Sequence, residues 1–193
     1  MTYQKIDVEN ISVEICYDDW ADSPRMWDNL TKFALFHKRY NLPNEVDTNE
    51  QDFNSWDEMR DELELEYKWV FPVYMYDHGG TAFSLKKFSC PWDAGQVGFI
   101  CVSEKDMWAN FPLGTDWDAK AYEIAEAELR TYGYYANGEV YGVRVFEDTE
   151  EVDSCFGYFG YDHKESGLLD ELNSYLSRIT TDRIKEQIMY KLI

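Results

Sequence analysis

The stretch WVFPVYMYDH, residues 69–78, marks the point at which the chain becomes β-like. It is rich in aromatic and β-branched residues, which favour strands, and Pro72 indicates either a strand start or a sheet edge. Two further strand candidates follow it, TAFSL at 81–85 and QVGFICV at 96–102. Together these three segments predict a sheet in the middle of the chain.

The densest run of unusual residues, FSCPWDAGQVGF at 88–99, lies inside this β-rich part. Its cysteine, tryptophan and aspartate crowd together as they would in an active site. The same residues also suit a turn, because Asp caps backbone amides and Gly adopts positive φ. We interpret Ser89–Gly95 as a loop that leads into a buried strand from Gln96 to Val102.

Further strands are expected on both sides of this region. Residues 11–17 alternate apolar and polar side chains, the pattern of a half-buried strand. The segments EVYGVRVFE at 139–147 and VDSCFGYFGY at 152–161 predict a hairpin joined by the acidic loop DTEE.

Helices are expected in five places. Ser23 or Asp22 could cap a helix over 22–41, in which Met26, Leu30, Phe33 and His37 recur at helical spacing. Ser55 and Glu58 form a capping-box pattern for a helix over 55–69, with Met59, Leu63 and Tyr67 as its inward stripe. Asp116 can cap a long helix over 117–132, and two more helices fit the C-terminal residues 166–193.

These elements predict an α+β fold with an antiparallel or mixed sheet of about five strands flanked by helices. No linker is evident, so we expect one domain over 1–193. It would contain an acidic helical segment at 45–66, a β-rich core at 69–165 and the C-terminal helices.

The charge is the clearest signal in the composition. The chain has 38 Asp and Glu against 18 Lys and Arg, a net charge of -20. Such self-repulsion opposes compaction, so the negative field is expected to serve either solubility or recognition of a basic partner. Phosphate-loop and dinucleotide patterns and basic patches are absent from the sequence, which disfavours direct nucleic-acid binding.

The cellular setting follows from the N-terminus and the cysteines. The start MTYQKIDVENIS is polar and does not resemble a signal peptide, and no apolar run approaches the ~20 residues of a membrane span. The four cysteines form no CxxC pair. We therefore expect a cytoplasmic protein with reduced thiols and no membrane association.

The acidic residues are clustered. The first cluster lies at 45–66, where Asp57/Asp61 and Glu58/Glu62/Glu66 fall at i,i+4 spacing on the expected helix. Stacked carboxylates of this kind imitate a row of phosphates. The second cluster is EDTEEVD at 147–153, and a third set lies on the long helix: Asp116, Asp118, Glu123, Glu126 and Glu128. The residues that we expect to bind a partner are Asp57, Glu58, Asp61, Glu62, Glu66, Glu147, Asp148, Glu150 and Glu151.

A mirrored pair of motifs offers an enzymatic alternative. YDH at 76–78 precedes SC at 89–90, whereas SC at 154–155 precedes YDH at 161–163. The residues that could converge as a metal site or a cysteine nucleophile are His78, Cys90, Asp93, Cys155 and His163. Their spacing is unlike that of zinc ligands, and a negative surrounding does not suit a thiolate, so we expect no catalytic residue, metal or cofactor.

The segments YMYDHGG, FSCPWDAGQVGF and SCFGYFGYDH resemble a family of uncharacterised acidic proteins of bacteriophages and mobile elements. The resemblance covers about residues 69–165 and implies a mobile-element context but no catalytic residue. In that context the expected cytoplasm is that of the host cell. At the level of class, such proteins are similar to DNA-mimic anti-restriction and anti-CRISPR inhibitors. The resemblance thus implies a partner with a basic nucleic-acid-binding surface, such as a restriction enzyme or a CRISPR effector. The oligomeric state stays open, a dimer included.

Overall fold

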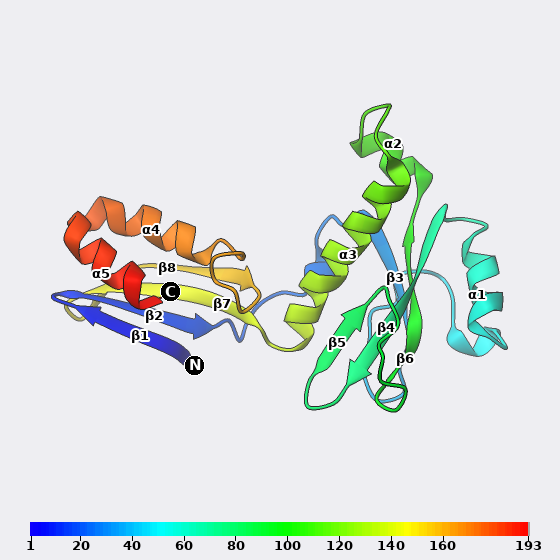
Figure 1. The fold of residues 1–193 in the computed structure, drawn as a ribbon, viewed down its shortest axis with the longest axis horizontal. Helices are drawn as coiled ribbons and strands as arrows, with labels where there is room; N and C mark the ends of the chain where they lie inside the picture. The colour runs from blue at the N-terminus through cyan, green and yellow to red at the C-terminus, as the bar shows by residue number, and fades with distance from the viewer. Residues whose placement is uncertain (193) are drawn as a thin grey trace. The chain divides into compact units, whose positions relative to one another are not determined.

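The computed structural model describes residues 1–192, and it confirms the α+β class. All strand pairs are antiparallel, but they form two four-stranded sheets where one sheet of about five strands was expected. The chain divides into two compact units, unit 1 over Met1–Asp22 and Tyr134–Ile193 and unit 2 over Ser23–Gly133. Each unit contains one of the sheets (Figure 1). The single domain over 1–193 stays a prediction.

Unit 1 is a sheet with two helices on one face. Its strands are β1 (Thr2–Val8), β2 (Ile11–Tyr17), β7 (Val140–Glu147) and β8 (Glu150–Phe159), in the order β1-β2-β7-β8. The helices α4 (Leu168–Ile179) and α5 (Asp182–Leu192) lie along this sheet (Figure 1). Leu172, Leu176 and Ile188 pack with the strand residues into one core, so the expected C-terminal helices are confirmed.

The expected hairpin is also confirmed, with a shorter turn. β7 and β8 pair as far as Glu147 and Glu150, so only Asp148 and Thr149 form the turn, and Asp148 has φ 54°. A two-residue turn of this kind requires positive φ, which Asp tolerates.

Unit 2 is a sheet with helices on both faces (Figure 1). Its strands are β3 (Thr31–Leu35), β4 (Trp69–Asp77), β5 (Thr81–Ser84) and β6 (Ala94–Val102), in the order β3-β6-β4-β5. The remaining elements are η1 (Pro24–Met26), η2 (Glu50–Asp52), α1 (Trp56–Leu63), α2 (Glu104–Asn110) and α3 (Trp117–Ala136). Met59 and Leu63 of α1 pack on one face of the sheet, whereas Met107 of α2 and Ala121 of α3 pack with Trp69 and Val102.

The expected loop into a buried strand is confirmed at FSCPWDAGQVGF, but the strand begins two residues earlier than the expected Gln96. β6 begins at Ala94, and its residues from Val97 to Val102 are buried. This strand lies between β3 and β4, so both of its edges are paired.

The expected helix over 22–41 is wrong beyond its first turn. Ser23 accepts a hydrogen bond from the Arg25 backbone, and Pro24 starts the 3-10 turn η1, which ends at Met26. Residues 31–35 then form strand β3, which pairs with β6 and buries Phe33 and Leu35. The helical spacing of the apolar residues was coincidental, because pairing with a buried strand outweighs local helix propensity.

Candidate functional site

Helix α1 presents most of the first acidic cluster on its outer side. Ser55 caps the helix by accepting a hydrogen bond from the Glu58 backbone N–H at 3.2 Å, as expected. Met59 and Leu63 are 1% and 3% exposed, which confirms them as part of the inward stripe. Trp56 is half-buried, and the other positions are exposed. These exposed positions include four of the predicted carboxylates: Asp57, Glu58, Asp61 and Glu62.

The charges of these four residues are not neutralised by the protein. In the part of the chain that the structure describes, 1–192, no ion pair involves them, and the single base of α1, Arg60, pairs with Glu64 at 2.7 Å. The Glu58 carboxylate accepts hydrogen bonds from the backbone and side-chain amides of Asn54, which lowers its pKa. We call Asp57, Glu58, Asp61 and Glu62 the α1 acidic row.

Glu66 does not belong to this row, which corrects the sequence-based expectation. The helix ends at Leu63 with Glu64 as its C-cap, so Glu66 lies beyond the last helical turn. The chain turns there because the Glu66 and Tyr67 backbone N–H groups both bond to the Leu63 carbonyl. Burial, and then the charge of Glu66, raise the pKa of Tyr67 to about 12.

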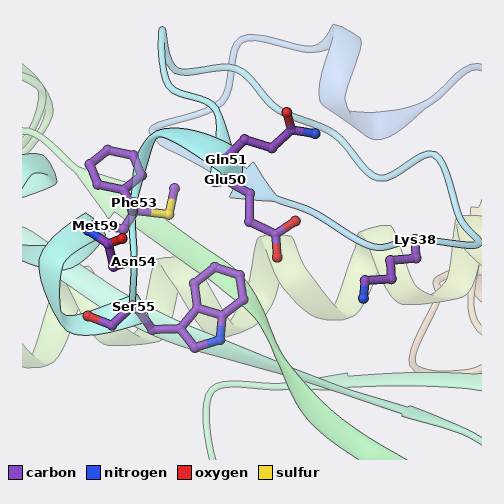
Figure 2. Close-up of a pocket in the computed structure, with 8 residues that line it drawn as sticks. Lys38, Glu50, Gln51, Phe53, Asn54, Ser55 and Met59 are labelled. Atoms are coloured by element: carbon purple, nitrogen blue, oxygen red, sulfur yellow. The ribbon is translucent and has the colours of Figure 1, made fainter.

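A pocket of about 520 Å³ adjoins the row, and no motif in the sequence predicted it. Figure 2 shows Phe53 and Met59 together on one side of this pocket and Lys38 on the opposite side. Its lining residues come from the β3–η2 region and from the start of α1: Lys38, Glu50, Gln51, Phe53, Asn54, Ser55, Trp56 and Met59. The sequence feature that could have indicated this pocket is a pair of aromatic residues, Phe53 and Trp56, within a strongly acidic segment.

The second acidic cluster lies on the β7–β8 hairpin of unit 1 and is partly neutralised. Glu151 forms an ion pair with Arg144, which lowers the pKa of Glu151. Glu147 accepts a hydrogen bond from the Asn10 side chain at 3.1 Å. Asp148 and Glu150 are exposed at the turn. The predicted partner-binding residues are thus divided between the two units.

Members of the third acidic set have internal partners. Asp116 accepts a hydrogen bond from the Ala119 backbone and caps α3, as expected. Asp118 accepts one from the Trp69 indole at 2.6 Å, and Glu128 pairs with Arg25. These three carboxylates have structural partners within unit 2.

The mirrored motifs do not form one four-residue centre within either unit. In unit 2, His78 Nδ1 lies 3.5 Å from Asp93 Oδ2, and the Cys90 sulfur lies 3.7 Å from the same oxygen. The carboxylate therefore lies between the thiol and the imidazole, which does not place the imidazole to accept the thiol proton. Cys155 and His163 belong to unit 1.

The residues in unit 1 have separate surroundings. Cys155 accepts a hydrogen bond from the Tyr158 hydroxyl at 3.3 Å. The His163 ring packs against Tyr3 and Tyr141, and neither of its buried nitrogens has a hydrogen-bond partner. Over residues 1–192, no three His, Cys, Asp or Glu side chains are grouped so that they could hold a metal ion.

The search for membrane-spanning helices and the comparison with known proteins give no further indication of function. Within residues 1–192, no helix is both long and apolar enough to cross a membrane. Comparison of the chain with protein-family models, curated proteins and solved structures finds no match.

Proposed function

We propose that the protein is a non-enzymatic nucleic-acid mimic that binds the basic nucleic-acid channel of a host defence nuclease. The observation that carries this proposal is the α1 acidic row, which is exposed and has no ion pair among the described residues. Like charges at i,i+4 destabilise a helix by a few tenths of a kcal/mol per pair, so the arrangement is unfavourable for α1 itself. A cationic partner would remove that repulsion.

The geometry of the row supports imitation of a phosphate backbone. Asp57 and Asp61, and likewise Glu58 and Glu62, are four residues apart, which corresponds to a rise of about 6 Å along a helix. Duplex DNA advances about 3.4 Å per phosphate on each strand, so two turns of α1 span a few phosphates. This is a short imitation, which suits one segment of a nuclease channel rather than its full length.

The charge of each unit supports fast association with a basic surface. Unit 1 has 18 Asp and Glu against 7 Lys and Arg, a net charge of −11, and unit 2 has 20 against 11, a net charge of −9. Complementary potentials raise association rates and make binding sensitive to salt. The nature of the target, a restriction enzyme or a CRISPR effector, is inferred from the resemblance to mobile-element proteins.

The hairpin residues Asp148 and Glu150 form a second contact surface in this proposal. Glu147 and Glu151 contribute less, because their charges already have partners in Asn10 and Arg144. Reversal of Asp148 and Glu150 is therefore expected to weaken binding less than reversal of the α1 acidic row.

The proposal is tested by neutralising the row in D57N/E58Q/D61N/E62Q. A matched control, D28N/D170N/D182N/E186Q, removes the same number of exposed charges elsewhere. Each protein is assayed for displacement of a labelled DNA duplex from candidate restriction and CRISPR nucleases, at low and at moderate salt. We expect the row variant to lose at least about tenfold in displacement, because several charge contacts are removed together. Its displacement should also depend less steeply on salt than that of the parent protein.

The control should keep displacement within about twofold of the parent protein, because its four exposed charges lie outside the proposed contact surface. An equal loss of displacement in both variants would show that inhibition depends on net charge and not on the position of the carboxylates on α1. Unchanged displacement by the row variant, with every nuclease that the parent inhibits, would refute the proposal.

A further inference from the structure

The pocket next to the α1 acidic row has an apolar floor that packs against the core of unit 2. Met59 is 1% exposed and belongs to the core of unit 2, and the half-buried Phe53 and Trp56 pack against that core. The Trp56 ring also meets Phe99 of β6 edge-on, with ring centroids 6.0 Å apart. A floor held by the sheet in this way is formed before any ligand binds.

The rim of the pocket is polar and continuous with the acidic row. Asn54 and Ser55 line the pocket, and both hydrogen-bond to Glu58 of the row. Glu50 lies in the middle of the pocket in Figure 2, and over residues 1–192 no ion pair involves it. A ligand would therefore meet an aromatic floor and a carboxylate that has no cationic partner.

We propose that this pocket binds an arginine side chain of the basic partner, with its stem and guanidinium on the aromatic floor and its charge facing Glu50. The inference rests on the proposed function, because it assigns the anchor residue of the same contact. Guanidinium groups are planar, stack on aromatic rings and pair with carboxylates, whereas the more strongly hydrated ammonium of lysine leaves water less readily. Charge alone sets association rate more than affinity, so such an anchor is what the acidic row needs to hold a partner.

The charges around the pocket favour a cation over an anion. Lys38 is the single base of the lining and lies across the pocket from Phe53 (Figure 2). Against it are Glu50 and the neighbouring carboxylates Asp52 and Glu58. A phosphate or carboxylate ligand would face this excess of negative charge, whereas an arginine would be opposed by Lys38 alone.

Lys38 and Glu50 provide opposite tests of the ligand's charge. Replacement of Glu50 by Gln should weaken an arginine ligand about fivefold, the size of one partly exposed ion pair. Replacement of Lys38 by Gln removes a like charge, so the same ligand should bind equally well or up to about threefold more tightly. An anionic ligand would respond in the reverse order.

The experiment titrates the full chain with a synthetic nonapeptide that alternates arginine and glycine, with a citrulline-for-arginine peptide as the neutral control. The indole N–H resonance of Trp56, assigned with the W56F variant, reports occupancy of the pocket in heteronuclear NMR spectra. We expect this resonance to shift with the arginine peptide and not with the citrulline peptide. The affinity should fall in E50Q and not in K38Q.

The outcomes separate the pocket from the proposed function. If the arginine peptide binds and D57N/E58Q/D61N/E62Q abolishes binding, but the Trp56 resonance does not move, the pocket proposal is overturned and the α1 acidic row keeps its role. If E50Q leaves the affinity unchanged, or if the peptide does not bind at all, the arginine assignment is also overturned. Failure of the proposed function has its own measure, the DNA displacement assay on nucleases.

Discussion

Arg25 Nη1 lies 2.7 Å from Glu128 Oε2, and only 6% of the Arg25 side chain is exposed. The same guanidinium pairs with Glu45 at 2.8 Å and donates to the Thr31 carbonyl. It thereby joins the η1 turn, strand β3, the following loop and helix α3. Burial by itself would lower the pKa of Arg25, but the hydrogen bonds to both glutamates outweigh it and raise that pKa.

Replacement of Arg25 by Met should lower the free energy of unfolding by about 3–5 kcal/mol, because two carboxylates lose their buried partner. Urea denaturation followed by circular dichroism measures this change. Arg39→Met is the control, since Arg39 is 70% exposed in its pair with Asp77 and should contribute less than about 1 kcal/mol. Similar losses in both variants would contradict a buried network at Arg25.

Replacement of Gly98 by Ala should destabilise unit 2 by about 3 kcal/mol or more, through overpacking and backbone strain. A Cβ atom at Gly98 would lie 1.9 Å from the Ala34 carbonyl oxygen of β3, and the φ of Gly98 is 143°. A Cβ atom at Gly95, near the start of the same strand, would meet no such neighbour within 4 Å, so Gly95→Ala should change stability by less than about 0.5 kcal/mol. Thermal and urea denaturation of the two variants compare the effects directly.

His163 should make unit 1 less stable as the pH falls below about 6.5, the usual pKa of histidine. Burial lowers the pKa of His163, with the charge of Asp162 acting in the opposite direction, so the unfolded chain binds the proton more readily. This contribution to stability is complete above the unfolded pKa and is lost as the pH falls from there towards the folded pKa. The rings of Tyr3 and Tyr141 face the imidazole and supply no charge to stabilise the protonated form near pH 6.

The measurement compares unfolding free energies of the parent and of His163→Phe between pH 8 and pH 5. The variant should have a smaller slope below about pH 6.5, and the two profiles should run parallel above about pH 7. It also removes two unpaired buried nitrogens, so its stability at pH 7 should not fall by the several kcal/mol of a core defect. Identical slopes at all pH values would show that His163 does not contribute to the pH dependence of stability.

Ser55, as the N-cap of α1, should contribute about 1 kcal/mol to the free energy of unfolding. Ser55→Ala leaves the first-turn amide of Glu58 without its acceptor, whereas Ser55→Asn keeps a capping oxygen and should restore most of the loss. Urea denaturation gives the stabilities, and amide exchange of residues 56–63 reports fraying of α1. If alanine and asparagine have the same effect, the cap does not stabilise this helix.

The cysteines of unit 2 should differ in reactivity. Cys101 is 0% exposed, and burial, with a smaller effect from the charge of Glu66, raises its pKa to about 12. Cys90 is half-buried in the loop before β6. Iodoacetamide at pH 8 should therefore modify Cys90 well before Cys101 in the native protein, and peptide mass spectrometry identifies the order. In urea the difference should disappear.

Local sequence patterns were sufficient for several elements and for part of the site. The caps Ser55 and Asp116, the hairpin of β7 and β8 and the two C-terminal helices follow from side-chain spacing and capping chemistry, which act over a few residues. The exposure of Asp57, Glu58, Asp61 and Glu62 follows in the same way. Once Met59 and Leu63 face the core, the geometry of α1 directs these carboxylates to its outer side.

Only the tertiary structure decided the rest. Residues 31–35 have helical spacing in the sequence but form β3, because their backbone pairs with β6, more than sixty positions away, in a buried sheet. The division into two sheets depends equally on distant pairing, such as that of β2 with β7. The pocket between η2 and α1, and the absence of ion pairs for the α1 acidic row over residues 1–192, also depend on which distant segments meet. The sequence by itself determined the charge and the local elements, whereas long-range packing decided which carboxylates remain available to a partner.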